Sequence, residues 1–203
     1  MAPRLDVTAA GVSCVEGGCS LPLAGGRVVI IVNVEELAVV DPALKSMEHC
    51  DCVVALRCGG DRVVLLHVEL KDLGLSLFAQ AAEGNASALE RLRKLVDDAA
   101  RKVYMCHARL FDRGTRDLHR FLAGHGSAAV AHVLLVAVPG PDNLAKGLPA
   151  GVASRVLRVY RRFLETLRSR LQGYCRSGTG CRGGVVACGD ARPVVEACRG
   201  GGR

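Results

Sequence analysis

Two carboxylates and one ammonium are the side chains in this sequence whose types and spacing are best suited to chemistry. Asp51 stands near the start of the segment 50–71, and Glu69 and Lys71 end it. Two runs rich in Val and Leu surround Gly59-Gly60-Asp61, which predicts a β-hairpin, because β-branched residues suit strands and glycine readily adopts positive φ. Since successive side chains of a strand alternate faces, Glu69 and Lys71 should share one face.

The length of the turn decides whether the two carboxylates meet. With a three-residue turn, Arg62 pairs with Cys58. The same register then sets Glu69 opposite Asp51. A two-residue turn would shift the pairing by one residue and separate the carboxylates. We expect the three-residue turn, and with it one cluster of charges at the end of the hairpin.

Two facing carboxylates in a buried strand pair repel each other unless a cation lies between them. Oxygen ligands from Asp51 and Glu69 suit Mg²⁺ or Mn²⁺, and Mg²⁺ keeps several waters and substrate phosphate oxygens in its shell. Lys71 would then lie beside a metal-bound water, where it could orient or activate it. The alternative is a hairpin whose polar ends only reach solvent at a sheet edge.

The pattern of an Asp on one strand and Glu69-Leu70-Lys71 at the end of the next resembles the PD-(D/E)XK phosphodiesterase superfamily, which includes restriction endonucleases and archaeal Holliday-junction resolvases. The resemblance covers about residues 27–110, with Cys50 where the family name has Pro. It implies a restriction-endonuclease-like fold and a metal-dependent cut of DNA. On this hypothesis the carbonyl of Leu70 is a further metal ligand.

The resemblance also suggests additional site residues on the flanking helices. An acidic residue from the helix before the hairpin can join the metal site in this family, and Glu35 or Glu36 stands in the matching region. Gln80 occupies the helix after Lys71, where some members carry a polar residue. Each of these has a simpler interpretation, a carboxylate in a solvated first turn or a solvent-facing amide.

Composition narrows the classes of function. The chain has 203 residues, of which 50% are hydrophobic, so it can build one sizeable core. A net charge of +7 and an isoelectric point near 9.0 favour a polyanionic partner. With only 3% aromatic residues and no Trp, recognition of single strands by base stacking is not expected.

The N-terminus lacks a continuous apolar run, and no apolar stretch reaches membrane-spanning length, so we expect a cytoplasmic protein without a membrane partner. Basic residues are mostly arginine, and Asn and Gln are rare. This bias fits a heat-adapted protein, although a GC-rich genome would also produce it. Ten cysteines agree with an archaeal thermophile, where intracellular disulfides are common.

Periodicity predicts an α/β domain over residues 1–172, with a central mixed sheet flanked by helices. The first expected elements are a loop or loose strand (1–25), a strand (27–34), a helical pattern (35–47) and the hairpin. They are followed by a short helix, a helix that begins with a capping box from Ser87 to Glu90, a strand (128–139) and a helix (152–171). The last helix carries Arg155, Arg158 and Arg162 among its arginines. They could follow DNA phosphates or form a solvated face.

Residues 173–203 form a Cys/Gly/Arg-rich tail, which we expect to be an appendage with a small hairpin and two disulfides. It has no Cys-x-x-Cys spacing, so zinc is not expected there. Cys14 and Cys19 could close a small disulfide loop or supply half a metal site. Cys50, Cys52 and Cys58 should alternate onto the face opposite Asp51 as buried free thiols, with a disulfide to another element as the second choice.

Three of the remaining polar residues show no evident role in the sequence alone. Cys106 and His107 have no spaced partner nearby, and His132 stands in an apolar strand, where a core histidine is the simplest interpretation. The sequence therefore favours a metal-dependent DNA phosphodiesterase. A non-catalytic nucleic-acid-binding protein of the same fold and a disulfide-stapled structural or partner-binding domain are the alternatives, and a homodimer is left open.

Overall fold

The computed structural model describes residues 4–8, 11–23, 28–34, 48–58, 62–109, 129–176, 181–190 and 192–199. Its strands are β1 (Arg4–Thr8), β2 (Gly11–Glu16), β3 (Cys19–Leu23), β4 (Val28–Asn33), β5 (Cys52–Arg57), β6 (Arg62–Leu70), β7 (Ala129–Val138) and β8 (Cys181–Ala187). Its helices are α3 (Leu75–Ala82), α4 (Ala86–Arg109), α6 (Pro141–Ala145), α7 (Ala150–Arg176) and α8 (Arg192–Arg199).

A mixed five-stranded sheet in the order β4-β5-β6-β7-β8 is the centre of the fold. Strands β4, β5 and β6 form an antiparallel meander, whereas β7 runs parallel to β6 and β8 parallel to β7. Parallel neighbours require long crossovers, which here contain α4 before β7 and α7 before β8. The predicted α/β class, with a mixed sheet flanked by helices, is confirmed.

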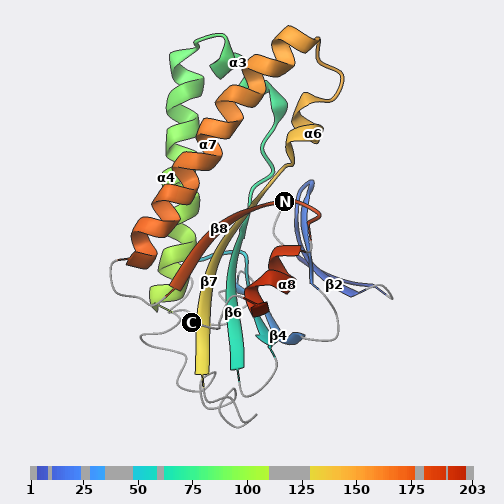
Figure 1. Ribbon diagram of the computed structural model, residues 1–203, viewed down its shortest axis with the longest axis vertical. Coiled ribbons are helices and arrows are strands. Elements are labelled where there is room, and N and C mark those ends of the chain that lie inside the picture. The colour runs from blue at the N-terminus through green and yellow to red at the C-terminus, as the bar shows by residue number, and fades with distance from the viewer. Residues whose placement is uncertain are drawn as a thin grey trace.

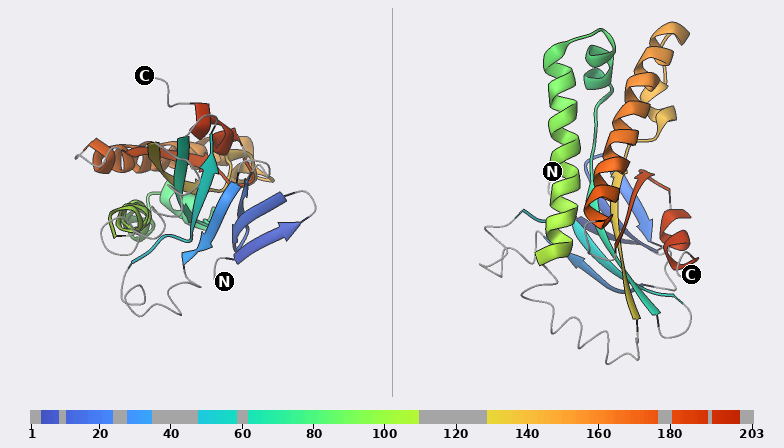
Figure 2. Two further views of the ribbon diagram at one scale, coloured as in Figure 1. Left: turned by 90° about the horizontal axis from the view of Figure 1, so that it is seen from below. Right: turned by 60° about the vertical axis from the view of Figure 1, so that its left-hand side comes forward.

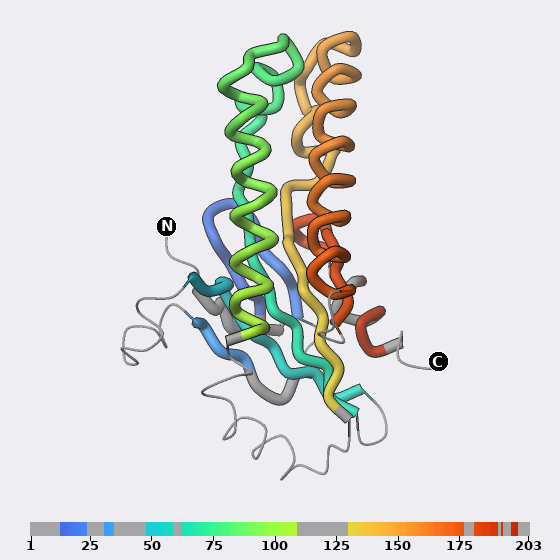
Figure 3. Tube along the Cα trace, turned by 90° about the vertical axis from the view of Figure 1, so that its left-hand side faces the viewer, coloured from blue at the N-terminus to red at the C-terminus, as the bar shows by residue number. Residues whose placement is uncertain are grey.

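The two faces of this sheet carry different layers (Figures 1 and 2). Helices α3, α4, α6 and α7 bury their apolar sides on one face, and α4 lies beside α7 (Figure 3). On the other face the sheet packs against residues of β2, β3 and α8. Since both faces are covered, β6 is buried from Val63 to Leu70, and its polar residues His67 and Glu69 are buried with it.

The long helices match their predicted apolar stripes with two differences. In α4 the side chain of Asn85 accepts a hydrogen bond from the N–H of Ala88 at 3.0 Å, so Asn85 caps the helix and the predicted capping box from Ser87 is wrong. Asparagine is as good an N-cap as serine, and its position one residue before the helix decides between them. In α7 the buried side includes Tyr160, whose hydroxyl donates to the carbonyl of Pro139.

The N-terminal segment is more regular than predicted. Strands β1, β2 and β3 form a separate antiparallel sheet, where a loop or loose strand was expected. Its second hairpin turns at Gly17 with φ of +55°, a conformation that favours glycine. Such short strands carry too weak a pattern to be seen in the sequence, and they are ordered by packing on the main sheet.

The C-terminal segment is integrated into the fold. The predicted boundary at residues 172 and 173 lies inside α7, and β8 is an edge strand of the main sheet. The expectation of a small hairpin within this segment is wrong, because residues 185–187 belong to β8 and residues 192–199 form α8. A seven-residue strand beside a parallel neighbour gains backbone pairing and apolar contact that an isolated hairpin lacks.

All ten cysteines are paired, in the bonds Cys14–Cys52, Cys19–Cys188, Cys50–Cys106, Cys58–Cys198 and Cys175–Cys181. The pairing of the tail cysteines as disulfides was expected, but only one bond lies within the tail. The other two tie β8 and α8 to the N-terminal half. The interpretations of Cys50, Cys52 and Cys58 as free thiols and of Cys14–Cys19 as a closed loop are wrong, because tertiary packing brings each of these cysteines beside a distant partner.

The contact between β8 and α7 gives a first testable prediction. A Cβ on Gly183 would lie 2.6 Å from Leu171 Cβ and 2.8 Å from its carbonyl carbon, so Gly183→Ala must push strand and helix apart. We expect a loss of about 1–3 kcal/mol in the free energy of unfolding, measured by chemical denaturation. As a control, Gly173→Ala in α7 meets no atom within 4 Å and should gain about 0.5–1 kcal/mol. Equal stability of wild type and Gly183→Ala would contradict this packing.

Candidate functional site

The hairpin has the register that the three-residue turn predicts. The ladder pairs Arg57 with Val63 and Cys52 with Val68, and the N–H of Cys58 donates to the carbonyl of Arg62 at 2.9 Å. The ladder ends at the pair of Cys52 and Val68, and Asp51 lies in a bend just before it, so the predicted pairing of Asp51 with Glu69 is not part of the ladder. The predicted register is therefore confirmed from Cys52 to Arg57, and Asp51 and Glu69 lie at the same end of the strand pair.

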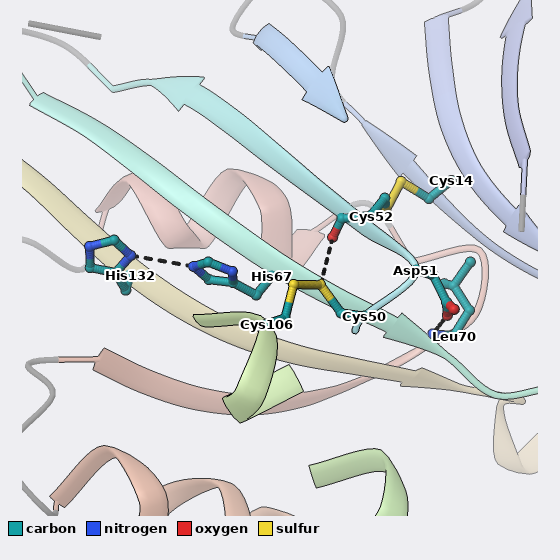
Figure 4. The surroundings of a disulfide bond; sticks show 8 residues. All are labelled: Cys14, Cys50, Asp51, Cys52, His67, Leu70, Cys106 and His132. Atoms are coloured by element: carbon teal, nitrogen blue, oxygen red, sulfur yellow. Dashed lines mark hydrogen bonds between the residues drawn. A yellow bond between two sulfur atoms is a disulfide. The ribbon is translucent and has the colours of Figure 1, made fainter. Parts of the chain in front are cut away.

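Asp51 lies in a bend immediately before β5. Its backbone N–H donates to the carbonyl of Val68 at 3.0 Å, and its Oδ2 accepts the N–H of Leu70 at 2.5 Å (Figure 4). The carboxylate thus ends the ladder by taking a backbone donor of the neighbouring strand. Because the chain bends here, Cys50 and Cys52 belong to the apolar clusters on opposite faces, so the prediction that they share a face is wrong.

Glu69 is fully buried and is neutralised by two ammonium groups. Lys71 Nζ lies 2.5 Å and Lys102 Nζ 3.5 Å from Glu69 Oε1. Within the described ranges, no donor hydrogen-bonds to Oε2 of this carboxylate. The lysine side chains are the exposed part of the group, at 15% for Lys71 and 32% for Lys102. An incoming anion would therefore meet positive charge first.

The charges of these groups shift one another's pKa values. Burial, then the negative charge of Glu69, raises the pKa of Asp51 to about 8. Burial also raises the pKa of Glu69, although Lys71 and Lys102 oppose it. For Lys71 burial by itself lowers the pKa, but the charges of Glu69, Asp51 and Glu16 outweigh it, so the net shift is upward and the group stays an ammonium.

Sequence reasoning missed two members of this cluster. Glu16 ends β2, and its charge raises the pKa of both Asp51 and Glu69. The turn after it is held to the end of β6, because the N–H of Gly18 donates to Asp72 Oδ2 at 2.8 Å. Lys102 comes from α4, where its position resembles any charged residue of a partly solvated helix. No local signal distinguishes either residue.

The other predicted site residues lie elsewhere. Gln80 is exposed on α3, which stands at the end of the helical pair that projects beyond the sheet (Figure 1). Glu35 and Glu36 are outside the described residues. Leu70 contributes its N–H to Asp51, and the role of its carbonyl stays a prediction.

The described cluster consists of three carboxylates, two ammonium groups and one backbone N–H. These belong to Asp51, Glu69 and Glu16, to Lys71 and Lys102, and to Leu70. Such a set suits a hard cation beside a phosphate.

The arginines chosen from the sequence are on the exposed side of α7, away from the buried side that covers the sheet. These residues are Arg155, Arg158 and Arg162. None of the described helices combines the length and apolarity that crossing a membrane requires. An exposed arginine row fits an anionic polymer as well as it fits a solvated face, so its role in binding stays a prediction.

Fold and site together define an α/β protein with a mixed five-stranded sheet, a second antiparallel sheet and a buried carboxylate–lysine cluster at the end of the central hairpin. The chain matches no protein-family model, no curated protein and no solved structure. Function must therefore be inferred from the chemistry of the cluster.

Proposed function

We propose that this protein is a metal-dependent DNA phosphodiesterase on a restriction-endonuclease-like fold, with its active site at Asp51, Glu69 and Lys71. The observation that supports the proposal is the cluster at the end of the hairpin, where the charge of Glu69 raises the pKa of Asp51 and Lys71 Nζ lies 2.5 Å from Glu69 Oε1. A sheet edge whose polar ends reach solvent would not bury Glu69 completely.

The donor set supports a hard divalent cation. Oε2 of Glu69 is buried and accepts no hydrogen bond from the part of the chain that the structure describes. Asp51 is held protonated near neutral pH by burial and by Glu69, with a pKa of about 8. Asp51 and Glu69 would hold Mg²⁺ or Mn²⁺, with Glu16 as an additional carboxylate. When bound, the metal would supply Lewis acidity at a phosphate oxygen and acidify a bound water.

The side chains of the protein have separate tasks in this proposal. Lys71 keeps its proton, so it is no general base, and it positions the attacking water and neutralises the phosphate by donating hydrogen bonds. Lys102 adds a second positive charge at the exposed side of the cluster. Asp51 must lose its proton before it can bind a cation, so metal affinity should strengthen as pH rises toward about 8.

DNA is the proposed substrate because the chain is basic and the exposed side of α7 is rich in arginine. Phosphate contacts by such residues make binding steeply dependent on salt. Arg158→Glu should weaken binding of DNA and lower its salt slope, while metal binding stays unchanged. A salt slope equal to that of wild type would remove Arg158 from the interface.

The experiment for the active site compares cleavage of duplex, single-stranded and branched DNA at elevated temperature with Mg²⁺ or Mn²⁺. Glu69→Gln and Asp51→Asn each remove one ligand charge and keep the shape of the side chain. Each should lower the cleavage rate by about a thousandfold and leave metal-free DNA binding equal or stronger. Glu83→Gln, at the exposed C-terminal end of α3, is the matched control and should cut like wild type.

Two outcomes decide against the proposal. If wild type cuts none of these substrates but binds them with a steep salt dependence, the protein is a non-catalytic nucleic-acid-binding protein. If Asp51→Asn or Glu69→Gln cuts at the wild-type rate while folded, the nuclease centre lies elsewhere. Lys71→Ala is a weaker test, because it also removes a positive charge that faces the phosphate.

A further inference from the structure

Three histidines that are far apart in the sequence converge between the sheet and α4. His67 is on β6, His107 is near the end of α4 and His132 is on β7. His67 and His107 are 1% and 5% exposed, and His132 is partly buried. Figure 4 shows His67 between His132 and the Cys50–Cys106 disulfide. Such a group is more polar than a core that is filled only for stability would contain.

The geometry of the three rings fits a single small cation. One ring nitrogen from each residue can be chosen so that all three lie within 4.8 Å of one another. Nε2 of His67 lies 3.4 Å from Nδ1 of His132, and the ring centroids are 4.8–5.7 Å apart. Tetrahedral Zn²⁺ with bonds of 2.0–2.1 Å places its ligand nitrogens about 3.3 Å apart. His67 and His132 already have that spacing, and one nitrogen of each of the three rings lies within 4.8 Å of the others.

We propose that His67, His107 and His132 form a binding site for Zn²⁺ or a similar borderline divalent cation. Neutral imidazole is the ligand that such cations prefer, whereas Mg²⁺ prefers oxygen. Burial, with the neighbouring His107 and His132, lowers the pKa of His67 well below its usual value. Three protein ligands leave one coordination position for water or another small ligand.

This site is separate from the carboxylate cluster and does not depend on the proposed function. His67 and Glu69 are on the same strand two residues apart, about 7 Å along it. The cluster at Glu69 offers carboxylate oxygens, and the histidine site offers imidazole nitrogens. The two sites should therefore select different metals from the same solution.

The sulfur atoms of Cys50 and Cys106 form a second group with His67, also within 4.8 Å. While the disulfide is intact these sulfurs are not thiolates and are poor ligands, because the thiolate is the form that binds metal. The oxidised protein should thus bind metal through nitrogen alone. This makes a spectroscopic test specific for the ligand set.

The test titrates the oxidised full-length protein with Co²⁺ and follows its visible absorption. Tetrahedral Co²⁺ gives strong visible bands, octahedral Co²⁺ among oxygens gives weak ones, and thiolate ligands add a charge-transfer band in the near ultraviolet. We expect strong visible bands that saturate at one equivalent, without the thiolate band, and that disappear when Zn²⁺ is added. Metal analysis after dialysis should then find one Zn²⁺ per chain.

Variants separate the three-histidine site from other binding. His132→Ala and His107→Ala should each weaken Co²⁺ binding by at least about a hundredfold, since even loss of a supporting residue costs 10–100-fold. His132 is partly exposed, so its variant should fold if the buried His107 variant does not. His49→Ala, a histidine outside the group, and Asp51→Asn, at the carboxylate cluster, should both keep the strong bands.

Three results would overturn the proposal. Absence of strong visible bands in the wild-type protein would show that no tetrahedral site forms. Bands that survive in folded His132→Ala would place the metal elsewhere. Loss of the bands in Asp51→Asn, or a thiolate band in the oxidised protein, would assign the cation to the carboxylates or to the cysteines.

Discussion

Asp51→Asn should make the metal-free protein more stable at pH 7 while it lowers the cleavage rate by about a thousandfold. In the folded protein the carboxyl is buried beside Glu69 with a pKa raised from 3.8 to about 8. The unfolded chain loses this proton near pH 4, and the folded protein keeps it until about pH 8. Between these two pH values the folded state therefore carries one proton more than the unfolded chain. Stability is fully present below this window and falls as pH rises through it, by about 1.4 kcal/mol per pH unit for this one group.

The measurement is the free energy of unfolding by chemical denaturation from pH 4 to pH 8. Asparagine can still accept the N–H of Leu70 but carries no titrating proton, so Asp51→Asn should lose this part of the slope. Because burial also raises the pKa of Glu69, part of the slope should remain in the variant. Asp98→Asn, on the surface of α4, should change stability by less than about 0.5 kcal/mol.

Added Mg²⁺ provides an independent check of the same carboxylate. A cation that binds only the folded state stabilises it, by about 2.7 kcal/mol at one hundred times its dissociation constant. Wild type should gain this stability at pH 8, and Asp51→Asn should not. If the variant is less stable than wild type at pH 7, or keeps the full pH slope, Asp51 is not the strained carboxyl that its burial indicates.

Reduction of the disulfides should unfold the protein at temperatures where the oxidised form is folded. Cys19–Cys188 spans 169 residues and Cys58–Cys198 spans 140, and both tie the C-terminal elements to the rest of the fold. In the chain-entropy model, one disulfide that closes so long a loop stabilises the folded state by about 5 kcal/mol. A second disulfide that closes a similar loop adds less, because the first has already restricted the unfolded chain. Loss of all five bonds should approach the whole stability of a domain, about 5–15 kcal/mol.

Thermal unfolding with and without reductant tests this, together with a count of free thiols in denaturant. No free thiol should be found before reduction. A double variant, Cys175→Ser with Cys181→Ser, is the control, because this bond spans only six residues and should contribute about 2 kcal/mol. Equal melting temperatures for oxidised and fully reduced protein would show that the bonds stabilise little, and reactive thiols in the untreated protein would reject the pairing.

The hairpin is where local sequence predicted most. Gly59 and Gly60 interrupt two apolar runs, and turn length with strand alternation is enough to predict the pairing from Cys52 with Val68 to Arg57 with Val63. The long helices and the strands β4, β6 and β7 also follow from periodicity, since each is long or apolar enough to show its own pattern. These features depend on neighbours within a few residues, which is the range over which sequence patterns are informative.

Tertiary structure alone decided which distant residues share a site. Glu16 and Lys102 reach the cluster from another sheet and another layer, and the partners of the cysteines are up to 169 residues apart. His67, His107 and His132 come together only because β7 pairs in parallel with β6 and α4 crosses their face. Such contacts are selected by the packing of whole elements, so no local spacing records them. Local sequence patterns were enough to predict the long helices, the long apolar strands and the pairing of the hairpin, and the packing of whole elements decided which charges, cysteines and imidazoles meet.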